Sequence, residues 1–126
     1  MKSLLLAIAC FCCMQLFSQE SEKKKEYLGV LTLTEKFKDE KNWTEKEQSI
    51  VGEHFQRLVK MKEEGIVILA GRTELALNDP EMMGLVVFSA KDDKEALQFM
   101  MDDPAVKNKI MIAKVHPYGL ALIKCE

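Results

Sequence analysis

The spacing of apolar residues divides the chain after residue 26 into strand-like and helix-like segments. Short runs rich in β-branched and other apolar residues predict strands at residues 27–34, 66–70, 85–88 and 110–123. Apolar residues at helical spacing predict helices over residues 44–64 and 92–100, with a further helical turn from residue 103. The order strand, helix, strand, strand, helix, strand predicts an α+β, ferredoxin-like βαββαβ domain. In that fold two helices cover one face of a four-stranded antiparallel sheet.

The ends of these helices carry recognisable capping residues. Thr44 and Glu47 have the spacing of a capping box at the start of the first helix, and Gly65 follows its last turn. Asp103 precedes Pro104, an order typical of an N-cap followed by the first helical position. These signals support the helix boundaries independently of the apolar spacing.

A histidine lies within the apolar stripe of the first helix. At about 100° per residue, Val51, Phe55 and Leu58 form the centre of the face expected to meet the sheet. His54 falls inside the same arc. A histidine can give or take a proton near neutral pH, which makes His54 a candidate acid or base. The alternative is a core histidine whose nitrogens bond to the backbone or to a buried acid, because a polar group in this position needs a partner.

The first 26 residues differ in composition from the domain. Lys2 precedes an apolar run over residues 4–17, and Ser18 and a polar segment follow it. This order is typical of a secretory signal peptide, and the run is shorter than the roughly 20 residues of a membrane span. We therefore expect a signal peptide over residues 1–18, a charged linker over 19–26 and one domain over 27–124. The mature protein is then periplasmic or secreted.

Charge and cysteine content argue against several classes of protein. Cleavage after Ser18 removes one lysine and no acid, which changes the net charge from −2 to −3 and leaves no basic field for nucleic acid. Cys125 is the only cysteine after residue 18, so an internal disulfide is excluded. Two distant histidines without a cysteine pair make no zinc signature, and phosphate-loop and nucleophile-elbow motifs are absent. We expect no metal and no cofactor.

The last predicted strand carries apolar residues on both of its sides. Met111, Ala113 and Val115 alternate with Ile112, Lys114 and His116 along it. Once helices cover one face of the sheet, the other face would leave more apolar surface than a small monomer usually exposes. A second copy related by a two-fold axis is the simplest cover, and we therefore predict a homodimer.

Several short segments, taken in order, resemble the YciI-like (YCII-related) family. They are Glu53-His54-Phe55-Gln56-Arg57-Leu58, Lys62-Glu63-Glu64-Gly65, Ile68-Leu69-Ala70-Gly71, Asp103-Pro104-Ala105-Val106-Lys107 and Val115-His116-Pro117-Tyr118. They are similar to the family's helical histidine, helix-ending glycine, strand ending in Ala-Gly, Asp-Pro-x-Val segment and final strand. The resemblance covers about residues 27–124. It implies a dimeric α+β barrel with a pocket and a His–Asp site.

The resemblance matches the helical histidine to His54 and the acid of Asp-Pro-x-Val to Asp103, the expected catalytic residues. Asp103 is also a natural helix cap, a role that needs no catalysis. Arg72 stands where proline usually follows Ala-Gly in the family. Its guanidinium could bind a carboxylate or an enolate oxygen of a substrate, or form an ion pair at the surface or between subunits. His116 is expected to contact the substrate or to lie at the dimer seam.

Two hypotheses follow. In the first, an exported homodimer binds a small organic molecule, His54 moves a proton and Arg72 stabilises developing negative charge, as in a cofactor-independent isomerase or lyase. In the second, the protein is a non-catalytic ligand-binding or scaffold dimer in the periplasm. Convergence of His54, Arg72 and Asp103 on one cavity favours the first. A filled interior with His54 bonded only to the backbone favours the second.

Overall fold

The computed structural model describes residues 22–125, so the expected signal peptide and the start of the linker lie outside the described residues. The elements are β1 (Lys25–Leu33), η1 (Glu35–Lys38), η2 (Glu40–Asn42), α1 (Glu45–Glu63), β2 (Val67–Arg72), β3 (Gly84–Ala90), α2 (Asp93–Met101), α3 (Pro104–Lys107) and β4 (Met111–Pro117). β1 begins two residues before the start expected from the sequence, because Lys25 and Glu26 pair with the end of β3.

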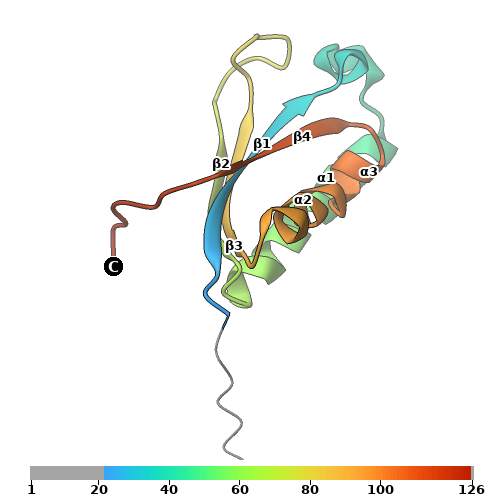
Figure 1. Ribbon diagram of the computed structural model, residues 1–126. Coiled ribbons are helices and arrows are strands. Elements are labelled where there is room, and N and C mark those ends of the chain that lie inside the picture. The colour runs from blue at the N-terminus through green and yellow to red at the C-terminus, as the bar shows by residue number, and fades with distance from the viewer. Residues whose placement is uncertain (1–21, 126) are drawn as a thin grey trace, which may run out of the picture.

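The four strands form one sheet in the order β2-β3-β1-β4, and every neighbouring pair is antiparallel. α1, α2 and α3 all lie on one face of this sheet, and none of the helices of residues 22–125 lies on the other face (Figure 1). This is the ferredoxin-like α+β arrangement that the element order predicts. It brings the middle of α1 over the strands and places α3 beside α1, although the two helices are far apart in sequence.

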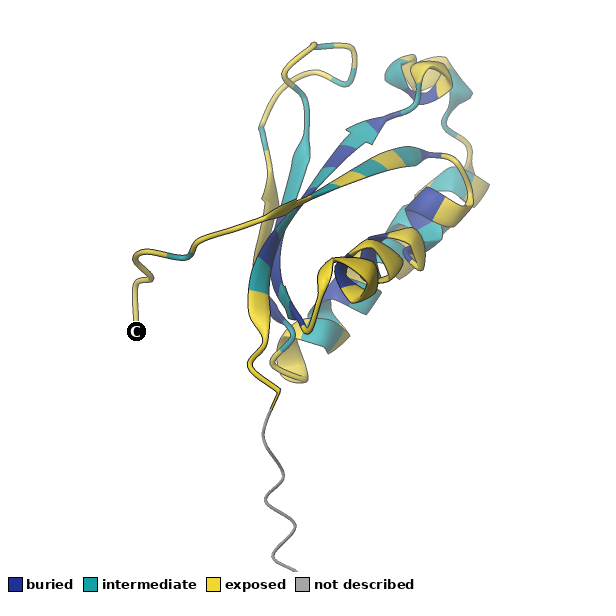
Figure 2. Cartoon of the chain, viewed as in Figure 1, coloured by how far each residue is buried: buried dark blue, intermediate teal, exposed yellow. Residues whose placement is uncertain are grey.

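The core lies between the sheet and the helices, where the buried residues gather (Figure 2). Alternate residues of β1 point into it, among them Tyr27 and Leu31, and Val86 and Phe88 of β3 meet them from the adjacent strand. The Phe88 ring stacks on Phe99 of α2 with 4.3 Å between ring centroids. This packing holds α2 against the centre of the sheet.

The capping residues act as the sequence predicts. The Thr44 backbone N–H donates to the Glu47 carboxylate over 3.1 Å, and the Thr44 hydroxyl oxygen accepts from the Lys46 amide over 3.3 Å. At the other end, Gly65 has φ of 76°, a conformation that glycine adopts without steric cost. α1 therefore begins and ends at defined residues, and this fixes the position of His54 along the helix above the sheet.

The prediction of a last strand over residues 110–123 is wrong in its second half. β4 ends at Pro117, whose partner across the ladder is Tyr27, close to the start of β1. Proline donates no hydrogen bond, and β1 has almost no residues left to pair with. One further bond, from the Tyr118 amide to the Glu26 carbonyl over 3.0 Å, closes the edge. The following residues run away from the domain on the side opposite the helices (Figure 1).

The segment over residues 35–43, which connects β1 to α1, contains two short 3-10 turns. Phe37 at its centre is buried, and its ring meets the Trp43 ring edge-on at 5.5 Å. The Trp43 indole N–H donates to the Phe37 carbonyl over 2.8 Å. One apolar and one amphipathic side chain thus pin this segment onto the end of the core.

The open face of the sheet is apolar and partly exposed. Leu28, Val30 and Leu85 lie on it, together with Leu69 and Ile112, which are 49% and 50% exposed. Surface of this kind often marks a protein–protein contact. In the described part of the chain, no helix is long and apolar enough to cross a membrane.

Candidate functional site

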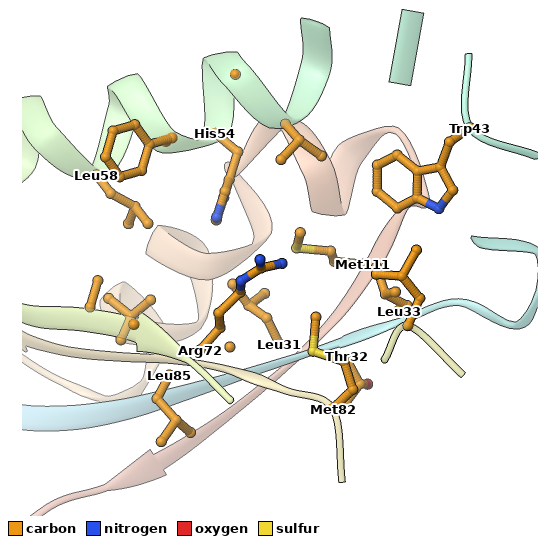
Figure 3. A pocket seen from close by; sticks show the side chains of 18 residues that line it. Leu31, Thr32, Leu33, Trp43, His54, Leu58, Arg72, Met82, Leu85 and Met111 are labelled. Atoms are coloured by element: carbon orange, nitrogen blue, oxygen red, sulfur yellow. The ribbon is translucent and has the colours of Figure 1, made fainter. Parts of the chain in front are cut away.

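The site is built around His54, in the middle of α1. Its imidazole Nδ1 lies 2.7 Å from Asp103 Oδ2, and the His54 side chain is 12% exposed. Asp103 holds the imidazole ring at Nδ1, and the opposite side of the ring points from α1 into a cavity above the sheet (Figure 3). The structure thus brings together the histidine and the acid that the sequence singles out, which are 49 residues apart.

Asp103 is the one buried charged or polar residue among those described, at 2% exposure. Its Oδ1 accepts the Ala105 amide over 2.9 Å and so caps α3, while its Oδ2 faces His54. The two roles considered for Asp103 therefore coexist, one on each carboxylate oxygen. The cap fixes the direction of the carboxyl group, and the carboxyl group in turn fixes the imidazole ring.

The protonation of this pair follows from the surroundings of Asp103. Burial alone would raise the pKa of the carboxyl group, but the hydrogen bond and charge of His54, the Ala105 amide and the Arg57 guanidinium outweigh burial and lower the pKa of Asp103. Asp103 is therefore ionised at neutral pH and can only accept hydrogen bonds. His54 must then carry a proton on Nδ1, which leaves Nε2 of the neutral ring as a proton acceptor.

His54 Nε2 is accessible rather than buried. Every buried side-chain nitrogen and oxygen of residues 22–125 has a hydrogen-bond partner. The only hydrogen bond of the His54 side chain within this range is the one from Nδ1 to Asp103. Nε2 must therefore reach open space, and the orientation of the ring directs it into the cavity (Figure 3).

A third member of the cluster, Arg57, was missed by the sequence reasoning. Its Nη1 lies 3.5 Å from Asp103 Oδ2, and its Nη2 donates to the Phe99 carbonyl over 2.7 Å. The guanidinium carbon sits 4.5 Å from the centre of the Phe99 ring. The available signal was the spacing of three residues from His54, which places both side chains on one face of a helix.

The buried face of α1 is correspondingly rotated from the predicted one. His54 and Arg57 are largely buried beside Leu58, whereas Phe55, placed at the centre of the face by its apolar character, is 59% exposed. α3 and the end of α2 cover the side of α1 that carries His54 and Arg57. Phe55 instead lines the cavity while remaining largely exposed.

The cavity lies between α1 and the sheet and has a volume of about 540 Å³. This is within the range of roughly 300–1,000 Å³ for small-molecule sites. Its walls are mostly apolar. The sheet contributes Leu31, Leu33, Val86 and Met111, α1 contributes Leu58, and Trp43 lies at one end. Leu77 and Met82, from the connection between β2 and β3, complete the lining.

Arg72 enters the same cavity from the end of β2. Its guanidinium points upward from the sheet, and the His54 imidazole points downward from α1 (Figure 3). Across the ladder from Arg72 stands Gly84, which has no side chain to fill the space beside it. Asp103 does not line the cavity but lies behind His54.

The remaining candidates lie elsewhere. His116 pairs with Leu28 on the open face of the sheet, so it does not line the cavity within one chain, and its substrate contact stays a prediction. Cys125 is an exposed free cysteine. Among residues 22–125, no group of three or more histidine, cysteine and acidic side chains is arranged to hold a metal ion.

The arrangement can perform proton transfer. A buried carboxylate that orients a histidine through Nδ1 leaves Nε2 as a base aimed at a bound molecule, and the protonated ring can return the proton. A guanidinium in the same cavity can stabilise negative charge that develops on that molecule. Neither step requires a group that the described residues do not supply.

Comparison with known sequences agrees with the fold and the motifs. The YCII-related domain family matches this chain over residues 20–117, which is most of its length. No curated protein matches the chain. The match includes β1 to β4 and all of α1, α2 and α3, so that His54, Arg72, Asp103 and Arg57 fall inside it. The chain therefore belongs to the YCII-related domain family.

Proposed function

We propose that the protein is an enzyme that moves a proton on a small organic molecule, of the cofactor-independent isomerase or lyase type. His54 Nε2 removes or returns the proton, Asp103 orients the ring and stabilises its protonated form, and Arg72 stabilises negative charge on the substrate. The observation that carries this proposal is the 2.7 Å contact between His54 Nδ1 and a buried, ionised Asp103, with the other end of the ring open to the cavity.

A test that needs no knowledge of the natural substrate is solvent exchange. Small carboxylic acids, ketones and lactones with an acidic C–H bond beside the carbonyl or carboxyl group are incubated with the protein in deuterated water and analysed by mass spectrometry. We expect deuterium incorporation into at least one of them, and its loss in His54→Gln, which removes the base but keeps a donor towards Asp103. Gln56→Ala, an exposed position on the same helix, is the control. Exchange that survives His54→Gln, or no exchange with any compound, contradicts the proposal.

The second candidate is a ligand-binding protein without catalysis. Its support is the structural role of Asp103, which caps α3 and is held by Arg57, so that the His54–Asp103 contact also has a purpose in folding. Ligand binding without deuterium exchange, combined with a large loss of stability in His54→Ala, would favour this candidate. An orphaned buried acid is expected to cost about 1–3 kcal/mol.

The proposal includes a second copy of the chain on the open face of the sheet. The exposed apolar side chains on that face, such as Leu69 and Ile112, support it. Light scattering at micromolar concentration should give twice the chain mass, and Ile112→Lys should shift the mass towards one chain. A monomeric wild type at all concentrations would exclude a homodimer.

Export is the last part of the proposal, and its support is the charge, apolar and small-residue order over residues 1–18. Intact-mass analysis of the protein from the periplasm or the culture medium should show loss of residues 1–18. A mass that retains these residues would count against export.

A further inference from the structure

Among the described residues, the cavity is lined by one cationic side chain, Arg72, and by no anionic one. His54 and Arg72 are its only ionisable lining side chains among the described residues, and no carboxylate lines it. Asp103, the nearest acid to His54, is turned away and already shared with Arg57 and the Ala105 amide. A cationic ligand would therefore be repelled by the Arg72 guanidinium, whereas an anion would be attracted by it and would meet no carboxylate of the lining.

Arg72 has no partner of its own. The four ion pairs among residues 22–125 use other side chains, and the Arg72 guanidinium makes no hydrogen bond in that range. Arg72 is an exposed residue, so water solvates its guanidinium at this wall of the cavity, and a ligand carboxylate can take the place of that water. Its planar, forked donors match a carboxylate, which can accept two parallel hydrogen bonds.

The rest of the lining offers almost nothing to a second polar group. Leu31, Leu58, Val86 and Met111 surround the space between His54 and Arg72. Trp43 closes one end with its ring alone, because its N–H already donates to the Phe37 carbonyl. A sugar, a nucleotide or a dicarboxylate would leave hydroxyl groups or a second charge unpaired against these walls, and such unpaired groups are strongly disfavoured.

We infer that the cavity binds a small organic monoanion, with one carboxylate on Arg72 and an apolar ring or short chain against Leu31, Val86 and Met111. This inference names the ligand class and rests on the pocket of the proposed function, but it concerns binding and not the reaction. The carbon beside the carboxylate then lies between Arg72 and His54. That position is the one from which Nε2 could take a proton.

The test is a matched set of probes titrated into the full protein and followed by amide chemical shifts. Phenylacetate carries the carboxylate and the apolar body, phenylacetamide is its neutral analogue and phenethylamine its cationic analogue. Acetate has the charge without the body, and phthalate has two charges. We expect phenylacetate to shift amides of β1, β3 and β4 around the cavity and to bind at least about tenfold more tightly than each of the others, a difference of about 1.4 kcal/mol.

Two variants locate the preference. Arg72→Gln should weaken phenylacetate binding about tenfold and bring it level with phenylacetamide, whereas Arg72→Lys should keep a reduced preference for the anion. Lys91→Gln, an exposed position outside the cavity, removes the same charge elsewhere and should change nothing. Because the exposed Arg72 side chain has no ion pair or hydrogen bond to lose among residues 22–125, neither Arg72 variant should lower the melting temperature.

Equal or tighter binding of phenylacetamide, a preference that survives Arg72→Gln, or no shift around the cavity with millimolar phenylacetate would overturn the inference. Failure of the inference and failure of the proposed function remain distinguishable. Monoanion binding without any deuterium exchange leaves the inference standing and rejects the enzyme. Exchange that depends on His54 but occurs on neutral compounds, without preference for anions, supports the enzyme and rejects the inference.

Discussion

Replacing Asp103 by asparagine separates its two roles. The amide has nearly the same shape, and asparagine is as good an N-cap as aspartate, so the bond from the Ala105 amide can remain. What is lost is the negative charge and an acceptor towards His54 and Arg57, which now lie 2.7 Å and 3.5 Å from Oδ2. Because Asp103 is only 2% exposed, water cannot replace that acceptor.

The size of the effect follows from the hydrogen bonds involved. A hydrogen bond to a charged group contributes about 1.5–3 kcal/mol, and we expect Asp103→Asn to lower the free energy of unfolding at pH 7 by that amount. The pKa of Asp103 is lower in the folded protein than the value of about 3.9 for an unfolded chain. Its contribution is therefore complete at neutral pH and is lost as the pH falls below about 4 through the folded pKa.

The assay is urea denaturation of wild type and variant at a series of pH values from neutral to acidic. The difference in unfolding free energy should be full at pH 7 and shrink steadily below about pH 4. Asp102→Asn is the matched control, because Asp102 is an adjacent but exposed acid whose side chain accepts only from Gln98; its effect should stay within about 0.5 kcal/mol. A difference that is absent at pH 7, or the same at both ends of the series, would refute the assignment of Asp103 as a buried, ionised partner of His54.

Three further substitutions test the surroundings of the site. Arg57→Met keeps an apolar stem over Phe99 but removes the guanidinium, so it should raise the pKa of Asp103 and make acid unfolding begin at higher pH; an unchanged acid limb would contradict the role of Arg57. Gly52→Ala should raise the free energy of unfolding by about 0.5–1 kcal/mol, because alanine favours the helix more than glycine does and the added Cβ would meet no atom within 4 Å; a lower melting temperature would contradict this. Tyr27→Phe removes the 2.8 Å bond to Asp93 Oδ1 and should lower the unfolding free energy by about 1 kcal/mol in denaturant titrations; no change would show that this bond does not stabilise the fold.

The fold could be predicted because its signals are local and agree with one another. Thr44 and Glu47 make the predicted capping box, Gly65 takes the left-handed conformation, and Asp103 caps the turn that begins at Pro104. Each of these depends on residues within a few positions along the chain. Burial alternates along β1 in the same local way, and this alternation marks the face that the helices cover.

The errors arise where the outcome depends on partners far away in sequence. The last strand stops at Pro117 because its antiparallel partner β1 begins there, and the alternating residues beyond Pro117 could not reveal that no partner is left. The apolar character of Phe55 placed it at the centre of the buried face of α1, but the position of α3 rotates that face towards Arg57. The apolar spacing along α1 therefore predicted that one face of the helix is buried, but it misplaced the centre of that face.

The candidate site was predictable in its members more than in its geometry. His54 stood out as a polar residue in an apolar stripe, and the resemblance to the family supplied Asp103 and its pairing. The convergence of Arg72 on His54 depends on the lengths of β2 and α1 and on how the helix lies over the sheet, and these are tertiary quantities. Arg57 was not singled out because nothing local shows that the Phe99 carbonyl and Asp103 lie within reach of its guanidinium.

The most direct test of the central claim is the tautomer of His54, read from the ¹⁵N chemical shifts and long-range ¹H–¹⁵N couplings of its neutral ring. We predict a proton on Nδ1, held by Asp103, and an unprotonated Nε2. In Asp103→Asn we predict the reverse, because the carbonyl oxygen stays on the Ala105 amide and the amide NH₂ then donates to Nδ1. A wild-type ring protonated on Nε2, or a tautomer that Asp103→Asn leaves unchanged, would contradict the assignment of His54 as a base oriented by Asp103.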